Sequence, residues 1–99
     1  MYNPTFLYII QIEMEDKKFY VYIILTERNT LYCGYTDDVL RRFELHKTGK
    51  GAKYTRANKP VKLVYTKEFP TKKEAQKEEY RIKHLPRKKK LEICNLENL

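Results

Sequence analysis

Two apolar segments separated by five polar residues constrain the fold more than any other feature of the chain. Residues 19–25 (FYVYIIL) are rich in aromatic and β-branched side chains, which is typical of a buried strand. Residues 26–30 are polar and turn-like, and residues 31–35 (LYCGY) predict a second short strand. The spacing therefore predicts a β-hairpin. Gly34 inside the second strand indicates a bulge or the close approach of another backbone.

Helices and a third strand are predicted after the hairpin. Asp37 can cap a helix that Gly49 ends, and Thr71 with Glu74 forms a capping box at the start of a later helix. The expected elements are a helix over residues 38–48, a loop or short helix over 50–59, a strand over 61–65, a helix from 71 to about 85, and a last short helix after Pro86. Together they predict an α/β (α+β) fold, in which a small central three-stranded antiparallel sheet is flanked by helices.

The chain of 99 residues has the length of one domain with short additions at both ends. We expect the domain over residues 19–95 and a tail over residues 96–99. Residues 1–18 are expected to form an N-terminal extension, which is either an extra edge strand around Leu7–Ile12 or a flexible segment.

Simple counts exclude several classes of protein. The apolar runs Phe6–Ile10 and 19–25 are both far shorter than the roughly 20 residues that a membrane-spanning helix needs. The N-terminus has neither the basic region nor the cleavage site of a secretory signal. Two cysteines and two histidines are too few and too scattered for a disulfide framework or a zinc site. We therefore expect a cytoplasmic protein with free thiols and no membrane partner.

The positive charge is concentrated in the second half of the chain. The net charge is +8, and residues 41–90 alone hold 18 bases and five acids. Residues 41–62 contain eight bases and a single acid, with aromatic side chains between them. Such a segment is either a solvated basic face or a surface that follows a phosphate backbone, which favours a nucleic-acid partner. The residues expected to contact that partner are Lys50, Lys53, Tyr54 and Arg56.

One carboxylate interrupts the apolar face of the helix predicted from residue 71. Ala75, Ile82 and Leu85 lie on one face of this helix, and Glu78 falls within it. A buried carboxylate is unfavourable unless it is paired or binds a metal. Glu78 is therefore either half of a fold-specifying ion pair with a buried arginine or a metal ligand in a cleft.

A second group of polar residues lies on the preceding helix and the hairpin. Arg42 and His46 are four residues apart and share a helix face, an arrangement that suits a site for a phosphate. Tyrosines crowd the hairpin, and alternation places Tyr20 and Tyr22 on one face of the first strand. Each tyrosine is a candidate for the core as well as for chemistry.

The order of these residues resembles the GIY-YIG nuclease superfamily, and in particular its small single-domain bacterial branch. Residues 20–23 (YVYI) and 32–34 (YCG) are similar to the paired motif that names the family. Arg42 follows the glycine by eight residues, as the family's essential arginine does, and His46 follows four residues later. The positions at which the chain departs from the paired motif are Tyr20, Val21 and Cys33.

The resemblance extends over residues 19–91. Residues 49–56 (GKGAKYTR) look like a loop of the small bacterial branch, and Glu78 is similar to the metal-binding glutamate on the family's later helix. The family often carries a late asparagine, for which Asn95 is the nearest counterpart.

The resemblance implies an endonuclease that hydrolyses phosphodiester bonds of DNA with Mg²⁺ or Mn²⁺. The implied catalytic residues are Tyr22, Tyr32, Arg42 and His46, and the implied metal ligand is Glu78. Arg42 would stabilise the phosphoryl charge, and either tyrosine would act as general base on water. The implied substrate is branched or single-stranded DNA, as in repair or recombination, and the basic segment is compatible with RNA as well.

Two functions without catalysis remain as alternatives. A nucleic-acid-binding module could keep the fold without keeping all five of these residues, and their joint presence favours the enzyme. A small adaptor for a larger repair factor would need an exposed apolar patch, for which Phe6–Ile12 is the candidate.

Overall fold

The sheet is built around one strand that is buried on both faces. The computed structural model describes residues 17–97. Its elements are β1 (Phe19–Thr26), β2 (Leu31–Thr36), α2 (Val39–Lys47), α3 (Lys53–Ala57), β3 (Pro60–Phe69), α4 (Lys72–Lys83) and α5 (Arg87–Ile93). The strand order is β2-β1-β3, and β1 is antiparallel to both neighbours. The predicted three-stranded antiparallel sheet with flanking helices is therefore confirmed.

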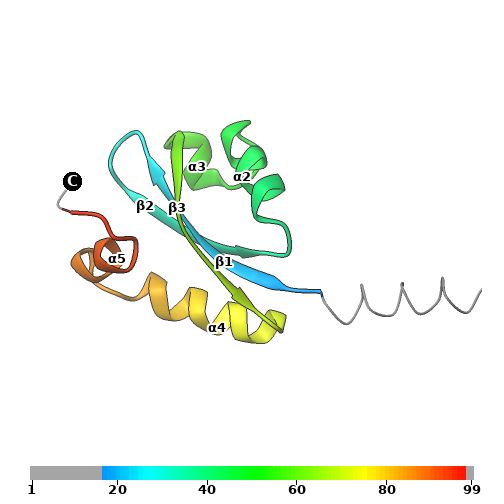
Figure 1. Cartoon of the computed structure of the whole chain (residues 1–99). Helices are drawn as coiled ribbons and strands as arrows, with labels where there is room; N and C mark the ends of the chain where they lie inside the picture. The colour runs from blue at the N-terminus through cyan, green and yellow to red at the C-terminus, as the bar shows by residue number, and fades with distance from the viewer. Residues whose placement is uncertain (1–16, 98–99) are drawn as a thin grey trace, which may run out of the picture.

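The helices cover opposite faces of this sheet (Figure 1). Helices α2 and α3 lie on one side, and α4 lies on the other. Val21 and Ile23 of β1 pack against Ala75 and Ile82 of α4, and all four side chains are buried. Burying a valine or isoleucine side chain contributes roughly 1.5–3 kcal/mol to folding. The face of the sheet that α4 covers therefore holds the main core. Tyr22, between the two β1 core residues, points to the opposite face.

The ends of the helices follow the predicted capping pattern with small differences. Asp38, rather than Asp37, caps α2, because its Oδ1 accepts a hydrogen bond from the Arg41 amide at 3.1 Å. Thr71 caps α4 and accepts from the Glu74 amide at 3.2 Å, as the capping box predicts. The segment left open between loop and helix contains the five-residue helix α3.

Strand β3 is longer than the predicted residues 61–65. It continues to Phe69, because Thr66, Lys67 and Glu68 pair with β1 even though their side chains are exposed. A strand with one solvent-facing side can carry polar residues, which the apolar pattern does not detect. The pairing of β1 with β3 shifts register between Ile23 and Ile24 and again at the end of β1.

Glycine is required at position 34 by the close approach of a side chain, not of a second backbone. It pairs with Tyr22 across the β1–β2 ladder. A Cβ atom at Gly34 would lie 2.7 Å from Cζ of Tyr22 and closer still to its hydroxyl oxygen. Any larger residue would displace the phenol, so Gly34 fixes where the Tyr22 hydroxyl lies.

The expected edge strand around Leu7–Ile12 and the apolar patch Phe6–Ile12 lie outside the described residues. Helix α5 is hydrogen-bonded to the turn between β1 and β2, since Arg87 Nη2 donates to the Asn29 carbonyl at 2.6 Å. Cys33 and Cys94 are buried free thiols. Among residues 17–97, no helix is long and apolar enough to cross a membrane.

Candidate functional site

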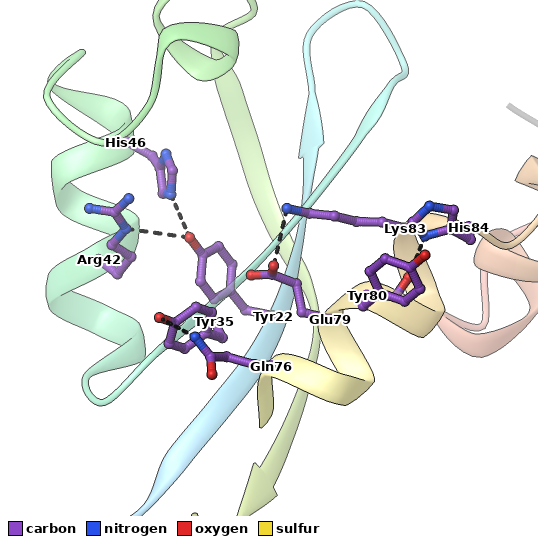
Figure 2. Close-up of polar contacts among 9 residues, drawn as sticks. All are labelled: Tyr22, Tyr35, Arg42, His46, Gln76, Glu79, Tyr80, Lys83 and His84. Atoms are coloured by element: carbon purple, nitrogen blue, oxygen red, sulfur yellow. Dashed lines mark hydrogen bonds and ion pairs between the residues drawn. The ribbon is translucent and has the colours of Figure 1, made fainter. Parts of the chain in front are cut away.

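A buried hydrogen-bonded chain connects β1, α2 and α3. The Tyr22 hydroxyl lies 2.7 Å from His46 Nε2, and Arg42 Nε donates to the same hydroxyl oxygen at 3.4 Å (Figure 2). His46 Nδ1 lies 2.6 Å from the Thr55 hydroxyl oxygen. Tyr22, His46 and Thr55 are at most 2% exposed. The structure therefore brings together three of the four residues implied as catalytic through direct hydrogen bonds.

The direction of these hydrogen bonds follows from the last member of the chain. The Thr55 hydroxyl donates to the Ala52 carbonyl at 3.2 Å, so its oxygen accepts from His46 Nδ1–H. A neutral imidazole protonated on Nδ1 has a free lone pair on Nε2. The Tyr22 hydroxyl then donates its proton to His46 Nε2, and its oxygen accepts from Arg42. Thr55 thus fixes the tautomer in which His46 can receive a proton from Tyr22.

Burial sets the protonation states of this chain. Burial, together with the positive charge of Arg42, lowers the pKa of His46 to about 4, so the imidazole is neutral at pH 7. Burial also raises the pKa of Tyr22 to about 12, although the hydrogen bond from Arg42 opposes the rise. The resting site therefore holds a neutral phenol against a neutral imidazole.

The lowered pKa of His46 predicts a pH-dependent stability. An unfolded histidine has a pKa near 6.5. Between that value and about 4 the unfolded chain binds a proton that the folded chain does not, so stability falls as the pH falls. The free energy of unfolding is measured with urea between pH 6.5 and 5, where most carboxylates stay ionised. It is expected to fall by up to about 1.4 kcal/mol for each pH unit. His46→Gln should remove this slope, whereas a slope unchanged by that substitution, or lost equally in His84→Gln, would contradict it.

The loop before α3 is attached to the same chain. Arg42 Nη2 donates to the Gly51 carbonyl at 2.8 Å. A Cβ atom at Gly51 would lie 2.7 Å from Cγ of His46, so only glycine lets the loop approach the imidazole this closely. Arg42 thus forms hydrogen bonds to Tyr22 through Nε and to the loop through Nη2. Its Nη1 has no hydrogen-bond partner among the residues that the structure describes.

Aromatic contacts place Tyr32 beside this chain. Its ring meets His46 edge-on, with the centroids 5.0 Å apart, and lies nearly parallel to the ring of Tyr54, with the centroids 5.9 Å apart. Tyr32 is half-buried and Tyr54 is 41% exposed. Tyr32 therefore joins the site through ring packing, and it links the site to α3.

The two adjacent glutamates of α4 face different surroundings. Glu78, the sequence-based candidate for the metal, is bound by Arg81 and lies 3.7 Å from Lys67 of β3. The hydrogen bond from Arg81 holds the pKa of the Glu78 carboxyl below its ordinary value. The negative charge of Glu79 instead makes a small contribution to the raised pKa of Tyr22, and Figure 2 shows the Glu79 side chain paired with Lys83. It is half-buried, and its carboxylate lies 3.2 Å from Lys83 Nζ.

The donor set fits a hard, hydrated cation. Within residues 17–97 there is no group of three or more histidine, cysteine, aspartate and glutamate side chains that could enclose a metal ion. A single carboxylate leaves most of the coordination sphere to water and phosphate oxygens, which suits Mg²⁺ or Mn²⁺ rather than zinc. Of the two α4 glutamates, Glu79 is the one whose charge acts on Tyr22.

The expected nucleic-acid contacts border the site. Lys50, Lys53 and Arg56 lie on α3 and the loop before it, and all three are exposed. They have no ion-pair partner in the described part of the chain. Asn95 follows α5 with a φ of 56°, in the left-handed region where asparagine commonly ends a helix. This backbone position accounts for Asn95 without a role in the site.

Sequence reasoning missed Thr55, Gly51 and Glu79. Thr55 and Gly51 lie in the segment GKGAKYTR, which the resemblance covered without assigning roles to them. Glu79 is four residues after Ala75 and three before Ile82, so helical spacing alone places it as close to the core face as Glu78.

Comparison with known proteins shows the family to which this chain is similar. The model of the GIY-YIG catalytic domain matches residues 18–92, which is most of the chain. The chain belongs to the GIY-YIG family. A UPF0213 protein of Oceanobacillus iheyensis is 48% identical to it over 82 residues, covering 83% of this chain and 95% of the relative. The UPF0213 protein YazA of Bacillus subtilis is 44% identical over 77 residues, covering 78% of each chain.

A solved member of the family has a similar fold. The solution structure of the UPF0213 protein BH0048 from Bacillus halodurans is 49% identical, with a TM-score of 0.52. The match covers 79% of this chain and 83% of that one. Membership in the GIY-YIG family, which the ordered motif of the sequence indicated, is thus confirmed.

Proposed function

We propose that this protein is a divalent-metal-dependent endonuclease that hydrolyses phosphodiester bonds of DNA. The observation that carries the proposal is the Arg42–Tyr22–His46–Thr55 hydrogen-bonded chain, because it orders a proton donor and its acceptor beside a guanidinium. Hydrolysis needs a proton acceptor for the attacking water and positive charge for the developing phosphorane, and this chain supplies both. The match to a catalytic-domain model supports the same conclusion.

Tyr22 is the general base in this proposal, acting together with His46. Its phenol is protonated at pH 7 and cannot take a second proton directly, since its pKa is raised to about 12. The Tyr22 oxygen can accept the proton of water only as its own proton passes to His46 Nε2, 2.7 Å away. Tyr32 forms no side-chain hydrogen bond within residues 17–97, so it has no comparable acceptor. We therefore assign Tyr32 to packing and substrate contact.

Arg42 neutralises the transition state. Its guanidinium is held by two hydrogen bonds, to Tyr22 and to Gly51, and its Nη1 is directed by them without a partner of its own in the described chain. A fixed guanidinium can donate to phosphate oxygens as negative charge accumulates on them.

Glu79 is the carboxylate that we propose for the metal, in place of Glu78. Glu78 has two cationic partners that satisfy it as a structural ion pair, the alternative that its sequence position left open. Over residues 17–97, Glu79 has one cationic partner, Lys83, and its charge acts on Tyr22. When bound, Mg²⁺ or Mn²⁺ would lower the pKa of water and stabilise charge on the phosphate.

Lys50, Lys53 and Arg56 would hold the phosphate backbone. Their exposure, their position on α3 and on the loop that Arg42 binds through Gly51, and the +8 net charge support this role. Contacts of this kind bind any sequence, so they suit a weakly specific or structure-directed enzyme. Branched or single-stranded DNA, as met in repair and recombination, is the substrate we propose.

A cleavage assay with matched phenylalanine variants tests this function. The protein should cut branched or single-stranded DNA in Mg²⁺ and stop when EDTA is added. Tyr22→Phe should lower the single-turnover rate by roughly 100-fold, because it removes the proton that His46 accepts. Tyr32→Phe keeps the ring and should retain most of the rate. Cleavage unaffected by EDTA, or an equal loss in the two variants, would contradict the proposal.

A further inference from the structure

An apolar pocket opens next to the site at the edge of the sheet. Its volume is about 270 Å³, and its apolar lining comes from Ile23, Leu31 and Ile82. Pockets for drug-sized ligands are roughly 300–1,000 Å³, so this one suits a single small ring system. Ile23 and Ile82 belong to the α4 face of the sheet, whereas Tyr32, which also lines the pocket, contacts His46 on the other face. The pocket therefore extends around the edge strand β2 and ends beside the site.

One wall of the pocket is a pair of aromatic rings. Tyr32 and Tyr54 both line it, and their rings are within 18° of parallel. Tyr54 projects from α3, between the exposed bases Lys53 and Arg56. A planar ligand attached to a phosphate backbone would thus find a stacking surface and cations on the same helix.

Two further lysines stand at the pocket. Lys83 of α4 is exposed, and Lys90 of α5 is half-buried without an ion-pair partner in residues 17–97. An apolar ligand alone would leave Lys90 without a counter-charge. Lys83 is already paired with Glu79, whereas a ligand with a flat apolar face and a negatively charged backbone would fill the pocket and supply a counter-charge to Lys90.

We propose that this pocket receives one unstacked nucleobase of the substrate strand, next to the phosphate that faces Arg42. This inference rests on the proposed nuclease function and narrows its substrate to a strand with a base free to leave the stack. Stacking on an aromatic side chain strengthens binding by roughly 5- to 150-fold per base. Extracting a paired base from a duplex costs a factor of similar size. The pocket therefore selects single-stranded DNA, or an unpaired position in branched DNA, over an intact duplex.

The test compares binding of a short single strand with binding of its backbone alone. Affinities are measured in EDTA, so that no cleavage occurs, for an oligonucleotide of about 12 residues and for an abasic oligomer with the same number of phosphates. The unmodified protein is expected to prefer the oligonucleotide by about 10-fold or more, and to prefer it over the duplex of the same sequence. Tyr54→Ala should bind both strands equally, whereas Tyr54→Phe should keep the preference because it keeps the ring.

A charge variant supplies the matched control. Replacing Lys50, Lys53 and Arg56 with neutral residues should weaken binding to both strands alike. It should also flatten the salt dependence by about one unit of slope per lost phosphate contact. Tyr54 stacks on Tyr32, so Tyr54→Ala should lower the melting temperature somewhat, and its affinities are measured at a temperature at which thermal unfolding shows the variant to be folded.

The outcomes separate this inference from the proposed function. Equal binding of both strands by the unmodified protein, or a preference that survives Tyr54→Ala, overturns the base pocket even if Mg²⁺-dependent cleavage is observed. A preference that depends on Tyr54 supports the pocket even if no cleavage occurs, and in that case the nuclease function alone fails. Failure to bind either strand overturns both.

Discussion

Glu79→Gln is expected to reduce the rate of metal-dependent cleavage by about 1,000-fold or more. Glutamine keeps the size of the side chain but removes the negative charge that would hold a divalent cation, and a catalytic metal contributes several kcal/mol of transition-state stabilisation. The variant should also fail to bind Mn²⁺, which is measured by paramagnetic broadening of nearby amide signals. Folding should be little changed, because the one ion pair that Glu79 forms within residues 17–97 is with the exposed Lys83.

Glu78→Gln is the matched control, one residue away on the same helix. It removes an ion pair with Arg81 and Lys67, so we expect a loss of about 1 kcal/mol in the free energy of unfolding and little change in cleavage. The reverse pattern, with Mn²⁺ binding and activity lost in Glu78→Gln and retained in Glu79→Gln, would assign the metal to Glu78, as the apolar pattern of the helix first indicated.

Arg42→Ala is expected to lower the cleavage rate by roughly 100- to 1,000-fold at saturating DNA. This is the usual effect of removing one donor that stabilises the transition state. DNA affinity should fall only slightly, because the exposed bases of the loop and α3 still hold the backbone. Lysine should restore little activity, since it offers charge without a planar group that can bind Tyr22, Gly51 and a phosphate together.

A purely structural role for Arg42 predicts a different result. Its hydrogen bonds to the Tyr22 hydroxyl and the Gly51 carbonyl also stabilise the fold, so Arg42→Ala should lower the melting temperature to some extent. Measuring the melting temperature and the single-turnover rate on the same sample separates the two roles. A destabilised variant whose folded fraction cleaves at the original rate would remove Arg42 from the chemistry.

The fold could be predicted because its signals are local. Apolar runs mark β1 and β2, Thr71 and Glu74 mark the start of α4, and Pro86 marks the gap before α5. The extension of β3 was missed because its last residues are polar and are held by pairing with β1 rather than by burial. Strand propensity and hydrophobic pattern are local, so they cannot detect backbone pairing with a strand that lies more than forty residues away.

Part of the site could be predicted because it too depends on local sequence. The spacing of Arg42 and His46 is a property of one helix, whereas the choice between Glu78 and Glu79 depends on what each side of α4 meets. Our proposal of Glu79 rests on residues outside the helix, namely Lys67 of β3, which pairs with Glu78, and Tyr22 of β1, whose pKa the charge of Glu79 affects. The tautomer of His46 depends likewise on Thr55, whose position is set by the conformation of the loop before α3.

Side chains alternate between the two faces of β1, so the function depends on correct strand pairing. Tyr22 lies between Val21 and Ile23, so the core and the hydrogen-bonded chain use neighbouring residues on opposite faces of one strand. A slip of one residue in the β1–β2 pairing would exchange the two faces and turn aliphatic side chains toward His46. The pairing of Gly34 with Tyr22 opposes such a slip, because only that position has room for the phenol. A molecule with slipped strands would keep its helices and its sheet and would have no site.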